Sequence, residues 1–390
     1  MRTRMCLFAL LLCALLLTGC WSSRELSELA IVVGVALDAG ESAETVVVTV
    51  QIAKAAEMKA GTGSSERSGG SSKANAYLNV QYEAESVSDA VREMSRMLSR
   101  KPYFPHNEVI LIGRELAGQG VSDELDMFMR DHESRMEMEL LVVDGTAADA
   151  LESTADMEPF PAHHIYESLN LQWANSKAMP MSVRKFSIDW LSPSGASMLP
   201  MMKLSYGATG EKQVMLSGMA VFSGDRMVGT LTPEESRGVL WVLGEAEDGT
   251  LLVDAPGGRV SLSMKSPKAV LKPSIQEDGS FAMSVSIECQ AFVSDSKTRD
   301  DLTKLEVVEY VQASAATVIR EEIEAALRHT KQMNTDVFGF GDTLNRAYFT
   351  TFRNVDWGEE FVKLPVKLDI KVAFISTGAI TKPLIPGGEA

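Results

Sequence analysis

The sequence predicts a multi-domain protein of mixed α/β and α+β class. Between residues 29 and 153, apolar runs of strand length alternate with amphipathic runs of helical length, a pattern typical of a mixed sheet covered by helices. The last third instead has two strictly alternating segments around one long helical pattern, which indicates long strands packed on a helix. Because 390 residues exceed what one core usually holds, we expect two or three domains from length, and the boundaries drawn below give three.

The first residues have the pattern of an export signal. Arg2 and Arg4 precede an apolar run, Met5 to Leu17, that is shorter than the roughly 20 residues needed to span a bilayer. The stretch Leu17-Thr18-Gly19-Cys20 resembles the bacterial lipoprotein box, whose cysteine receives a diacylglycerol thioether and becomes the new N-terminus. We therefore expect a signal peptide over residues 1–19, with diacylglycerol and an N-acyl chain on Cys20 as a stable anchor. The alternative is an ordinary signal peptide with an unrelated cysteine.

Charge and cysteine content narrow the possible functions. The formal net charge of −16 disfavours binding to nucleic acid or electrostatic docking on anionic lipid, since both need clusters of Lys and Arg. Two of the four cysteines, Cys6 and Cys13, fall in the expected signal peptide, and Cys20 is the expected lipid site. Only Cys289 remains, so we expect neither a disulfide framework nor a thiolate metal site.

An N-terminal α/β domain is predicted over residues 20–190. The continuous apolar run Leu29–Leu37 indicates a strand buried on both faces. A hairpin is expected from Thr45–Ala53 and Ala76–Glu83, with a flexible Gly/Ser-rich loop over residues 61–72. The later elements are expected as a helix over 86–100, a strand at Val109–Ile112, a helix at Val121–Arg130, a strand at Glu137–Val143, and helices at Thr146–Ser153 and Pro161–Ala174.

A small middle domain is predicted over residues 205–260, after a Ser-, Pro- and Gly-rich boundary around 189–210. Met215–Phe222 and Arg226–Leu231 indicate a hairpin, and a helix is expected to follow from Thr232 to Gly244.

A C-terminal α+β domain, an antiparallel sheet packed with a long helix, is predicted over residues 261–385. The alternating segments 281–291 and 362–374 indicate two strands with one buried face each, and Cys289 falls on such a face. Pro365 favours an edge position for the second strand. A helix over 302–333 is expected to place Glu321, Glu322 and Glu324 in solvent. Its inward stripe is expected to be Leu305, Val308, Val311, Ala315, Val318, Ala326 and Leu327.

No catalytic constellation emerges from the sequence, so we expect a non-enzymatic protein without a cofactor other than the lipid. It lacks a nucleophile elbow, a Walker A loop, an H-E-x-x-H pair and a Cys-x-x-Cys pair. Adjacent helical residues point about 100° apart, so His163 and His164 are not expected to chelate a metal together. The stretch Gly339-Phe340-Gly341 follows a helix and lacks the third glycine of a dinucleotide fingerprint. We expect its glycines to turn the chain and Phe338 and Phe340 to enter the core.

A charge cluster at Arg130, Asp131 and Arg135 has two interpretations. It could form part of an interface with another protein. More often such a run is a solvated helix end whose ion pairs each contribute less than about 1 kcal/mol.

A set of short motifs covers nearly the whole chain after Cys20. They are Cys20-Trp21, Arg24-Glu25-Leu26, Glu28-Leu29-Ala30, Val33-Gly34, Leu37-Asp38, His106, Val109–Gly113, Glu115-Leu116-Ala117, Phe128–Asp131, Arg135, Gly218–Phe222, Val228-Gly229 and Asp336–Gly341. In this order along the chain, they resemble the Ger(x)C family, the C-subunit lipoproteins of bacterial spore germinant receptors.

The resemblance implies a non-enzymatic subunit anchored on the outer face of the spore inner membrane. Such a subunit acts with A-type and B-type integral membrane subunits in a receptor for small nutrient germinants. It also implies three α/β-type domains and carries over no ligand-contact residues. The alternative function is a solute-binding lipoprotein that delivers a small nutrient to a transporter. That function would need two similar lobes around a cleft, and the unlike halves of this chain disfavour it. An envelope hydrolase is disfavoured by the lack of a nucleophile or metal set.

Overall fold

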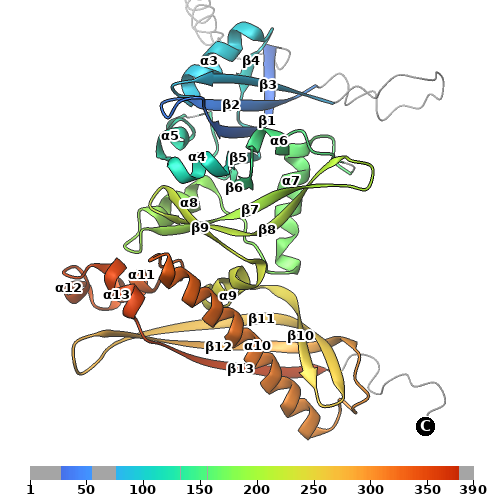
Figure 1. Ribbon diagram of the computed structural model, residues 1–390, viewed down its shortest axis with the longest axis vertical. Helices are drawn as coiled ribbons and strands as arrows, with labels where there is room; N and C mark the ends of the chain where they lie inside the picture. The colour runs from blue at the N-terminus through green and yellow to red at the C-terminus, as the bar shows by residue number, and fades with distance from the viewer. Residues whose placement is uncertain (1–27, 55–75, 132, 156, 377–390) are drawn as a thin grey trace, which may run out of the picture.

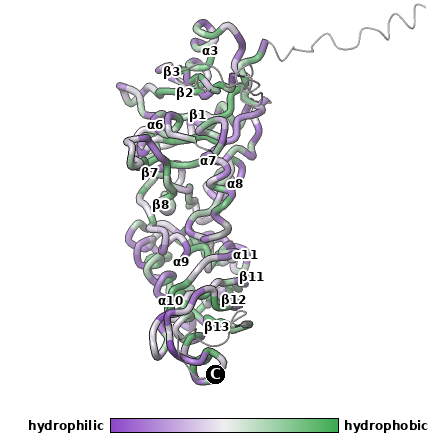
Figure 2. The backbone as a smooth tube through the Cα atoms, turned by 90° about the vertical axis from the view of Figure 1, so that its right-hand side faces the viewer, coloured by the Kyte–Doolittle hydropathy of each residue, from purple (hydrophilic) through white to green (hydrophobic). Residues whose placement is uncertain are grey.

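The computed structural model describes residues 28–54, 76–131, 133–155 and 157–376. In this part of the chain two sheets lie one above the other along an elongated molecule (Figure 1). The view turned by 90° shows the same order of elements, with helices α9 (Pro233–Leu243) and α11 (Phe340–Ala347) between the two sheets (Figure 2). The expected signal peptide, Cys20 and the Gly/Ser-rich loop lie outside the described residues.

Nine of the described strands form the upper, mixed sheet. In spatial order they are β3 (Tyr77–Ala84), β2 (Val46–Ala53), β1 (Leu29–Ala39), β5 (Val109–Gly113), β6 (Glu139–Asp144), β7 (Ala196–Tyr206), β8 (Lys212–Ser223) and β9 (Arg226–Leu231), with β4 (Lys101–Tyr103) beside the start of β1. The central strands β1, β5, β6 and β7 are parallel, and the outer pairs are antiparallel. Every residue of β5 is buried, as expected for a strand covered on both faces.

Helices cover both faces of this sheet. One face packs against α3 (Val87–Met97), α4 (Arg114–Gln119), α5 (Ser122–Arg130) and α8 (Val183–Trp190). The other packs against α6 (Ala147–Ala150) and α7 (Pro161–Asn170), which continues as a 3-10 turn, η2 (Leu171–Ala174). The predicted α/β arrangement of the N-terminal part is therefore confirmed.

The contacts of Asp38 with the start of α6 and with Gly113 explain the residue type at both positions. Asp38 ends the buried part of β1, and its carboxylate accepts hydrogen bonds from the N–H groups of Ala147 (2.6 Å) and Ala148 (2.9 Å). It thereby satisfies backbone donors in the first turn of α6. Gly113 lies against this carboxylate so closely that a Cβ atom there would overlap it.

Four of the described strands form the lower sheet, in the order β10 (Asp248–Ala255), β11 (Gly258–Ile275), β12 (Phe281–Ser296) and β13 (Val366–Ser376). Helix α10 (Leu305–Gln332) lies across one face, as Figure 1 shows, and short helices α12 (Phe349–Phe352) and α13 (Trp357–Lys363) precede β13. Strand β13 is at the edge, as Pro365 indicated. It runs parallel to β12, however, so the prediction of an antiparallel sheet is wrong for this pair. Helices α10 to α13 form the long crossover that parallel neighbours require.

The segment 205–260, expected to form a middle domain, contributes to both sheets. Its hairpin β8–β9 extends the upper sheet, β10 belongs to the lower sheet, and α9 lies between them. The long helix also differs in detail from the expected pattern. Val311, Ala315, Ala326 and Leu327 are buried as expected, whereas Leu305, in the first turn, is 70% exposed. One continuous hydrophobic cluster runs from the upper sheet through α9 and α10 into the lower sheet.

Candidate functional site

The charged residues singled out in the sequence lie at a solvated helix end. Arg130, at the end of α5, forms an ion pair of 2.7 Å with Asp126 one turn earlier, and both side chains are exposed. The carboxylate of Asp131 accepts hydrogen bonds from the backbone N–H of Glu133 (3.1 Å) and from Ser134 Oγ (3.3 Å). Arg135 is exposed. These contacts are local, and a role in an interface stays a prediction.

His163 lies between two carboxylates rather than beside a second metal ligand. Its Nδ1 is 2.8 Å from Glu108 Oε2, and its Nε2 is 3.4 Å from Glu158 Oε2. Burial lowers the pKa of His163, but the hydrogen bond with Glu108 and the nearby carboxylates outweigh it and raise the pKa. Within the described ranges, no group of three or more His, Cys, Asp or Glu side chains is placed to hold a metal ion.

A buried carboxylate organises the loop that follows the long helix. Asp336 is 3% exposed, and it accepts hydrogen bonds from the N–H groups of Phe338 (3.1 Å) and Gly341 (2.7 Å) and from Trp357 Nε1 (3.1 Å). Phe338 and Phe340 are fully buried and stack with their ring centroids 5.2 Å apart. Between them Gly339 has a φ of 69°, a left-handed conformation that favours glycine. The predicted turn and core roles of this stretch are confirmed.

This loop forms one wall of a pocket between the two halves of the molecule, which we call the joint pocket. Its volume is about 190 Å³. The opposite wall comes from α8 and from the segment that leads into β7. The lining residues are Met179, Met181, Lys185, Asp189, Ser192, Ser194, Ala196, Ser197, Met198, Leu243, Glu245, Asp336, Val337, Gly339 and Asp342. Ser194 connects the two walls, because its Oγ is 3.3 Å from Asp336 Oδ2 and 3.2 Å from Asp342 Oδ2.

The joint pocket is rich in carboxylates whose ionisation is disfavoured. Burial raises the pKa of Asp336 to about 6, although the backbone N–H groups and Trp357 act in the opposite direction. Burial also raises the pKa of Asp189 to about 6; Lys185 opposes this shift, and Asp342 and Glu245 add to it. The ammonium of Lys185 lies 3.8 Å from Glu245 at the rim. Acidic groups therefore outnumber basic groups in the pocket.

A buried ion pair joins α9 to α10 beside the joint. Arg237 and Glu322 form a two-pronged contact, with Arg237 Nε 3.0 Å from Glu322 Oε2 and Arg237 Nη2 bonded to Oε1. Trp241 Nε1 donates to the same carboxylate at 3.0 Å. Both charged side chains are less than a tenth exposed, so the prediction that Glu322 faces solvent is wrong. Gly238 lies directly against the backbone of α10 at Glu322, where a Cβ atom would not fit, and so allows the two helices to approach closely.

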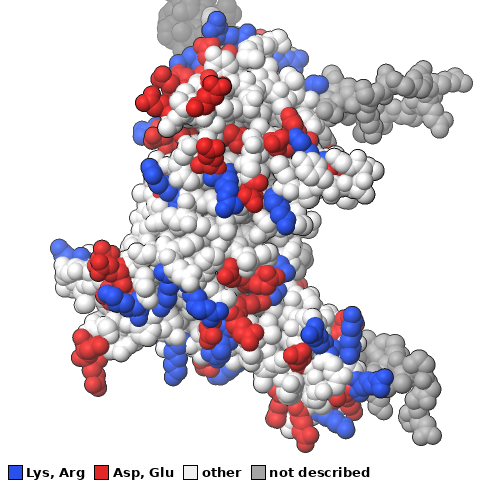
Figure 3. Space-filling view, in the orientation of Figure 1, with Lys and Arg blue, Asp and Glu red and all other residues white. Residues whose placement is uncertain are grey.

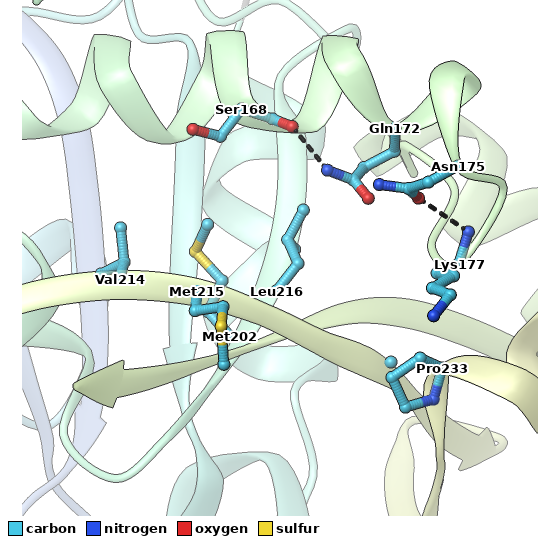
Figure 4. A pocket seen from close by; sticks show the side chains of 10 residues that line it. Ser168, Gln172, Asn175, Lys177, Met202, Val214, Met215, Leu216 and Pro233 are labelled. Carbon is cyan, nitrogen blue, oxygen red and sulfur yellow. Dashed lines mark hydrogen bonds between the residues drawn. The ribbon is translucent and has the colours of Figure 1, made fainter. Parts of the chain in front are cut away.

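A second cavity of about 300 Å³ lies between α7–η2 and the β7–β8 hairpin. Figure 4 shows Met202, Val214, Met215 and Leu216 on the strand side, facing Gln172 and Asn175. The polar groups are already engaged locally: Gln172 Nε2 donates to the carbonyl of Ser168 (2.9 Å), and Asn175 Oδ1 accepts from the N–H of Lys177 (3.0 Å), as the dashed lines in Figure 4 mark.

The fold and these sites define a multi-domain α/β and α+β protein in which Asp336 and the Arg237–Glu322 pair are buried where the two sheets meet. Two family models match the chain: the spore germination protein N-terminal domain at residues 22–204, and the spore germination B3/GerAC-like C-terminal domain at residues 217–378. The chain therefore belongs to the Ger(x)C family of spore germination proteins.

Individual relatives match over almost their whole length. The chain is 24% identical to spore germination protein YndF of Bacillus subtilis (strain 168), over 93% of this chain and 94% of that protein. It is 23% identical to spore germination protein KC of the same strain, with 98% of each chain covered. The crystal structure of the GerBC protein matches with a TM-score of 0.53 and 17% identity, over 88% of this chain and 97% of that one, which shows a shared fold.

Some of these features were predictable from the sequence, and others were not. The loop 336–341 was expected to turn the chain and fill the core, but nothing in its pattern showed that Asp336 would sit at its centre. Arg237 lies in the buried stretch of α9, but it follows Glu234, Glu235 and Ser236 in the sequence, so no local pattern indicated a buried partner. As for membrane insertion, none of the described helices is both long and apolar enough to cross a bilayer.

Proposed function

We propose that this protein is the lipid-anchored C subunit of a nutrient germinant receptor, needed for spore germination in response to small-molecule germinants. In this proposal residues 1–19 are removed, and Cys20 carries diacylglycerol and an N-acyl chain. The protein then sits on the outer face of the spore inner membrane. It performs no catalysis and needs no cofactor other than this lipid. It acts by assembling with A-type and B-type integral membrane subunits.

The observation that carries the proposal is the match of both family models, which together extend from residue 22 to residue 378 with a short gap. The relatives' names support the same role, since they include spore germination proteins A3, B3 and KC.

The surface offers a place for a protein partner. Figure 3 shows a belt with few charged residues across the visible face at the level of β8 and β9. On these strands Met215 is 49% exposed and Val228 is 45% exposed. Charged residues are depleted at the centres of protein interfaces, so a charge-poor belt fits the assembly role.

Replacement of the lipid-bearing cysteine tests the anchored assembly. Spores with Cys20→Ala are expected to lose the germinant response, and immunoblots are expected to show lower levels of the partner subunits. Cys13→Ala is the matched control, because this cysteine falls in the expected signal peptide and its loss should leave germination unchanged. Normal germination and normal partner levels in Cys20→Ala spores would contradict the proposal.

The charge-poor belt has its own test. Val228→Asp places a charge on β9 at a position that is already half exposed, so the fold should tolerate it. We expect less of the variant to co-purify with the A-type and B-type subunits. Leu252→Asp is the control, since Leu252 is 54% exposed on β10 of the lower sheet. If Val228→Asp and Leu252→Asp both co-purify with the A-type and B-type subunits as well as the wild-type protein does, this belt is not the interface.

A further inference from the structure

The joint pocket contains buried polar atoms that the protein itself does not satisfy. Ser197, on β7, is 3% exposed, and its Oγ has no hydrogen-bond partner among the described residues. Ser192 Oγ and Asp342 Oδ1 also have no hydrogen-bond partner among the described residues, although these two residues are only partly buried. All three residues line the pocket. An unsatisfied buried polar group costs about 1 to 3 kcal/mol, so native structures usually provide it with a partner.

The pocket holds more acceptors than donors. Ser194 Oγ lies within hydrogen-bond distance of both Asp336 and Asp342, but a hydroxyl has one proton and can donate to only one of them. Lys185 does not supply the missing donor, because its Nζ lies beside Glu245 Oε1 (3.8 Å) and Met179 Sδ (3.3 Å) at the rim. The free carboxylate oxygen of Asp342 therefore calls for a donor from a bound molecule, and the unpartnered hydroxyls of Ser192 and Ser197 can accept from such a donor as well as donate.

Charge and shape define the ligand further. Four acidic residues line the pocket against the single ammonium of Lys185, so a cation is favoured there. The rest of the lining is largely aliphatic or thioether, which suits a short carbon chain. The volume of about 190 Å³ admits only a small molecule. The apolar side chains are Met179, Met181, Met198, Leu243 and Val337.

We propose that the joint pocket binds a small aliphatic primary ammonium ion. Its N–H groups donate to Asp342 Oδ1 and Ser197 Oγ, and its carbon chain packs against the methionine side chains. Because Ser197 belongs to the upper sheet and Asp342 to the first turn of α11, the bound cation stabilises the joint between the two halves. The inference goes beyond the receptor role and does not depend on it, since binding can be measured on the purified chain alone.

Calorimetric titration and thermal unfolding of the full chain at neutral pH test the proposal, with ethylammonium chloride as the probe. We expect saturable binding and a rise in Tm that saturates at the same concentration. Asp342→Asn is expected to weaken binding at least about tenfold, because it removes a charged acceptor. Ser197→Ala should weaken it about threefold without loss of stability, because the hydroxyl it removes has no partner in the protein.

Matched salts and a matched variant separate specific binding from general ion effects. Tetramethylammonium chloride has the charge but no N–H donors, and it should not bind. Asp369→Asn, at an exposed position of the edge strand β13, should bind ethylammonium like wild type. The proposal is overturned if potassium or tetramethylammonium chloride gives the same saturable effect, if no binding is detected, or if Asp342→Asn and Ser197→Ala bind as tightly as wild type.

Discussion

At the scale of single residues, Asp336 holds the loop after α10 together from the inside. Alanine at this position would leave the N–H groups of Phe338 and Gly341 and the indole N–H of Trp357 without their acceptor. Since each unsatisfied buried donor costs about 1 to 3 kcal/mol, we expect Asp336→Ala to lower the free energy of unfolding by about 3 to 5 kcal/mol. Urea denaturation measures this change.

Two further variants make the test of Asp336 specific. Asp336→Asn keeps one acceptor oxygen and should cost less than the alanine variant. Asp342→Ala changes a nearby carboxylate, in the first turn of α11, whose Oδ1 has no partner among the described residues, and it should cost less than about 1 kcal/mol. Equal losses in Asp336→Ala and Asp342→Ala would show that the loop is not organised around Asp336.

Cys289 gives a second prediction at this scale. It is 3% exposed on the inner face of β12, and burial raises its pKa to about 12. The thiolate is the reactive form, so the folded protein should be inert to a thiol reagent such as Ellman's reagent at neutral pH. In a protein that begins at Trp21, where Cys289 is the single cysteine, one thiol should react after unfolding in urea, and Cys289→Ala should abolish that signal. Rapid labelling of Cys289 in the folded protein would contradict the buried position.

The sequence predicted some of these side chains because a local pattern defines them. Strict alternation placed Cys289 inside, and the position of Phe338 and Phe340 after a helix placed them in the core. Glu322 could not be found in this way. It is one of three glutamates within four positions, and its partner Arg237 lies 85 residues away. A buried charge becomes predictable only when the partner that neutralises it is known.

At the scale of elements, the contact of α9 with α10 depends on a charged pair in an apolar setting. Removal of one partner leaves the other charge buried, which typically costs about 3 to 5 kcal/mol. We therefore expect Glu322→Ala and Arg237→Ala each to destabilise the protein by that amount. The double variant Arg237→Met, Glu322→Leu should recover most of the loss, because it leaves no buried charge.

A double-mutant cycle in urea measures the coupling between these residues. Glu321→Ala is the control, because this neighbour is exposed on the same helix and should change the free energy of unfolding by less than about 0.5 kcal/mol. Additive losses in the double alanine variant would mean that Arg237 and Glu322 stabilise the helices independently, and the buried pair would not explain the contact.

Most helices and strands were predictable because the period of the apolar residues differs between the two types of element. The directions and partners of strands were not. An alternating strand has the same pattern whether its neighbour is parallel or antiparallel, so β13 was assigned the wrong direction relative to β12. In the same way, a hairpin signal does not show which sheet it joins, and β8–β9 extends the upper sheet rather than standing alone. Composition therefore does not show whether a segment after a predicted boundary forms its own domain or extends a sheet that came before it.

At the scale of the whole molecule, the joint concentrates negative charge from both halves. Asp189 comes from α8 of the upper half, and Asp342 comes from the first turn of α11 in the lower half. Burial raises the pKa of Asp189 to about 6, and Asp342 and Glu245 add to the shift. The folded protein therefore holds this proton more tightly than the unfolded chain does. The stabilising contribution is complete below about pH 4 and is lost as the pH rises through about 6.

Because folding raises the pKa of Asp189, we predict that Asp189→Asn is more stable than wild type at neutral pH. A shift of about two pKa units corresponds to at most about 3 kcal/mol, and the partial exposure of Asp189 reduces the expected gain to about 1 to 2 kcal/mol. The gain should disappear towards about pH 4, where the wild-type carboxyl is protonated in the folded protein. Urea unfolding at a series of pH values measures it, with the exposed Asp369→Asn as a control that should show no such trend. If Asp189→Asn is instead less stable at neutral pH, the ionised carboxylate has a favourable partner such as Lys185, and charge repulsion does not govern the joint.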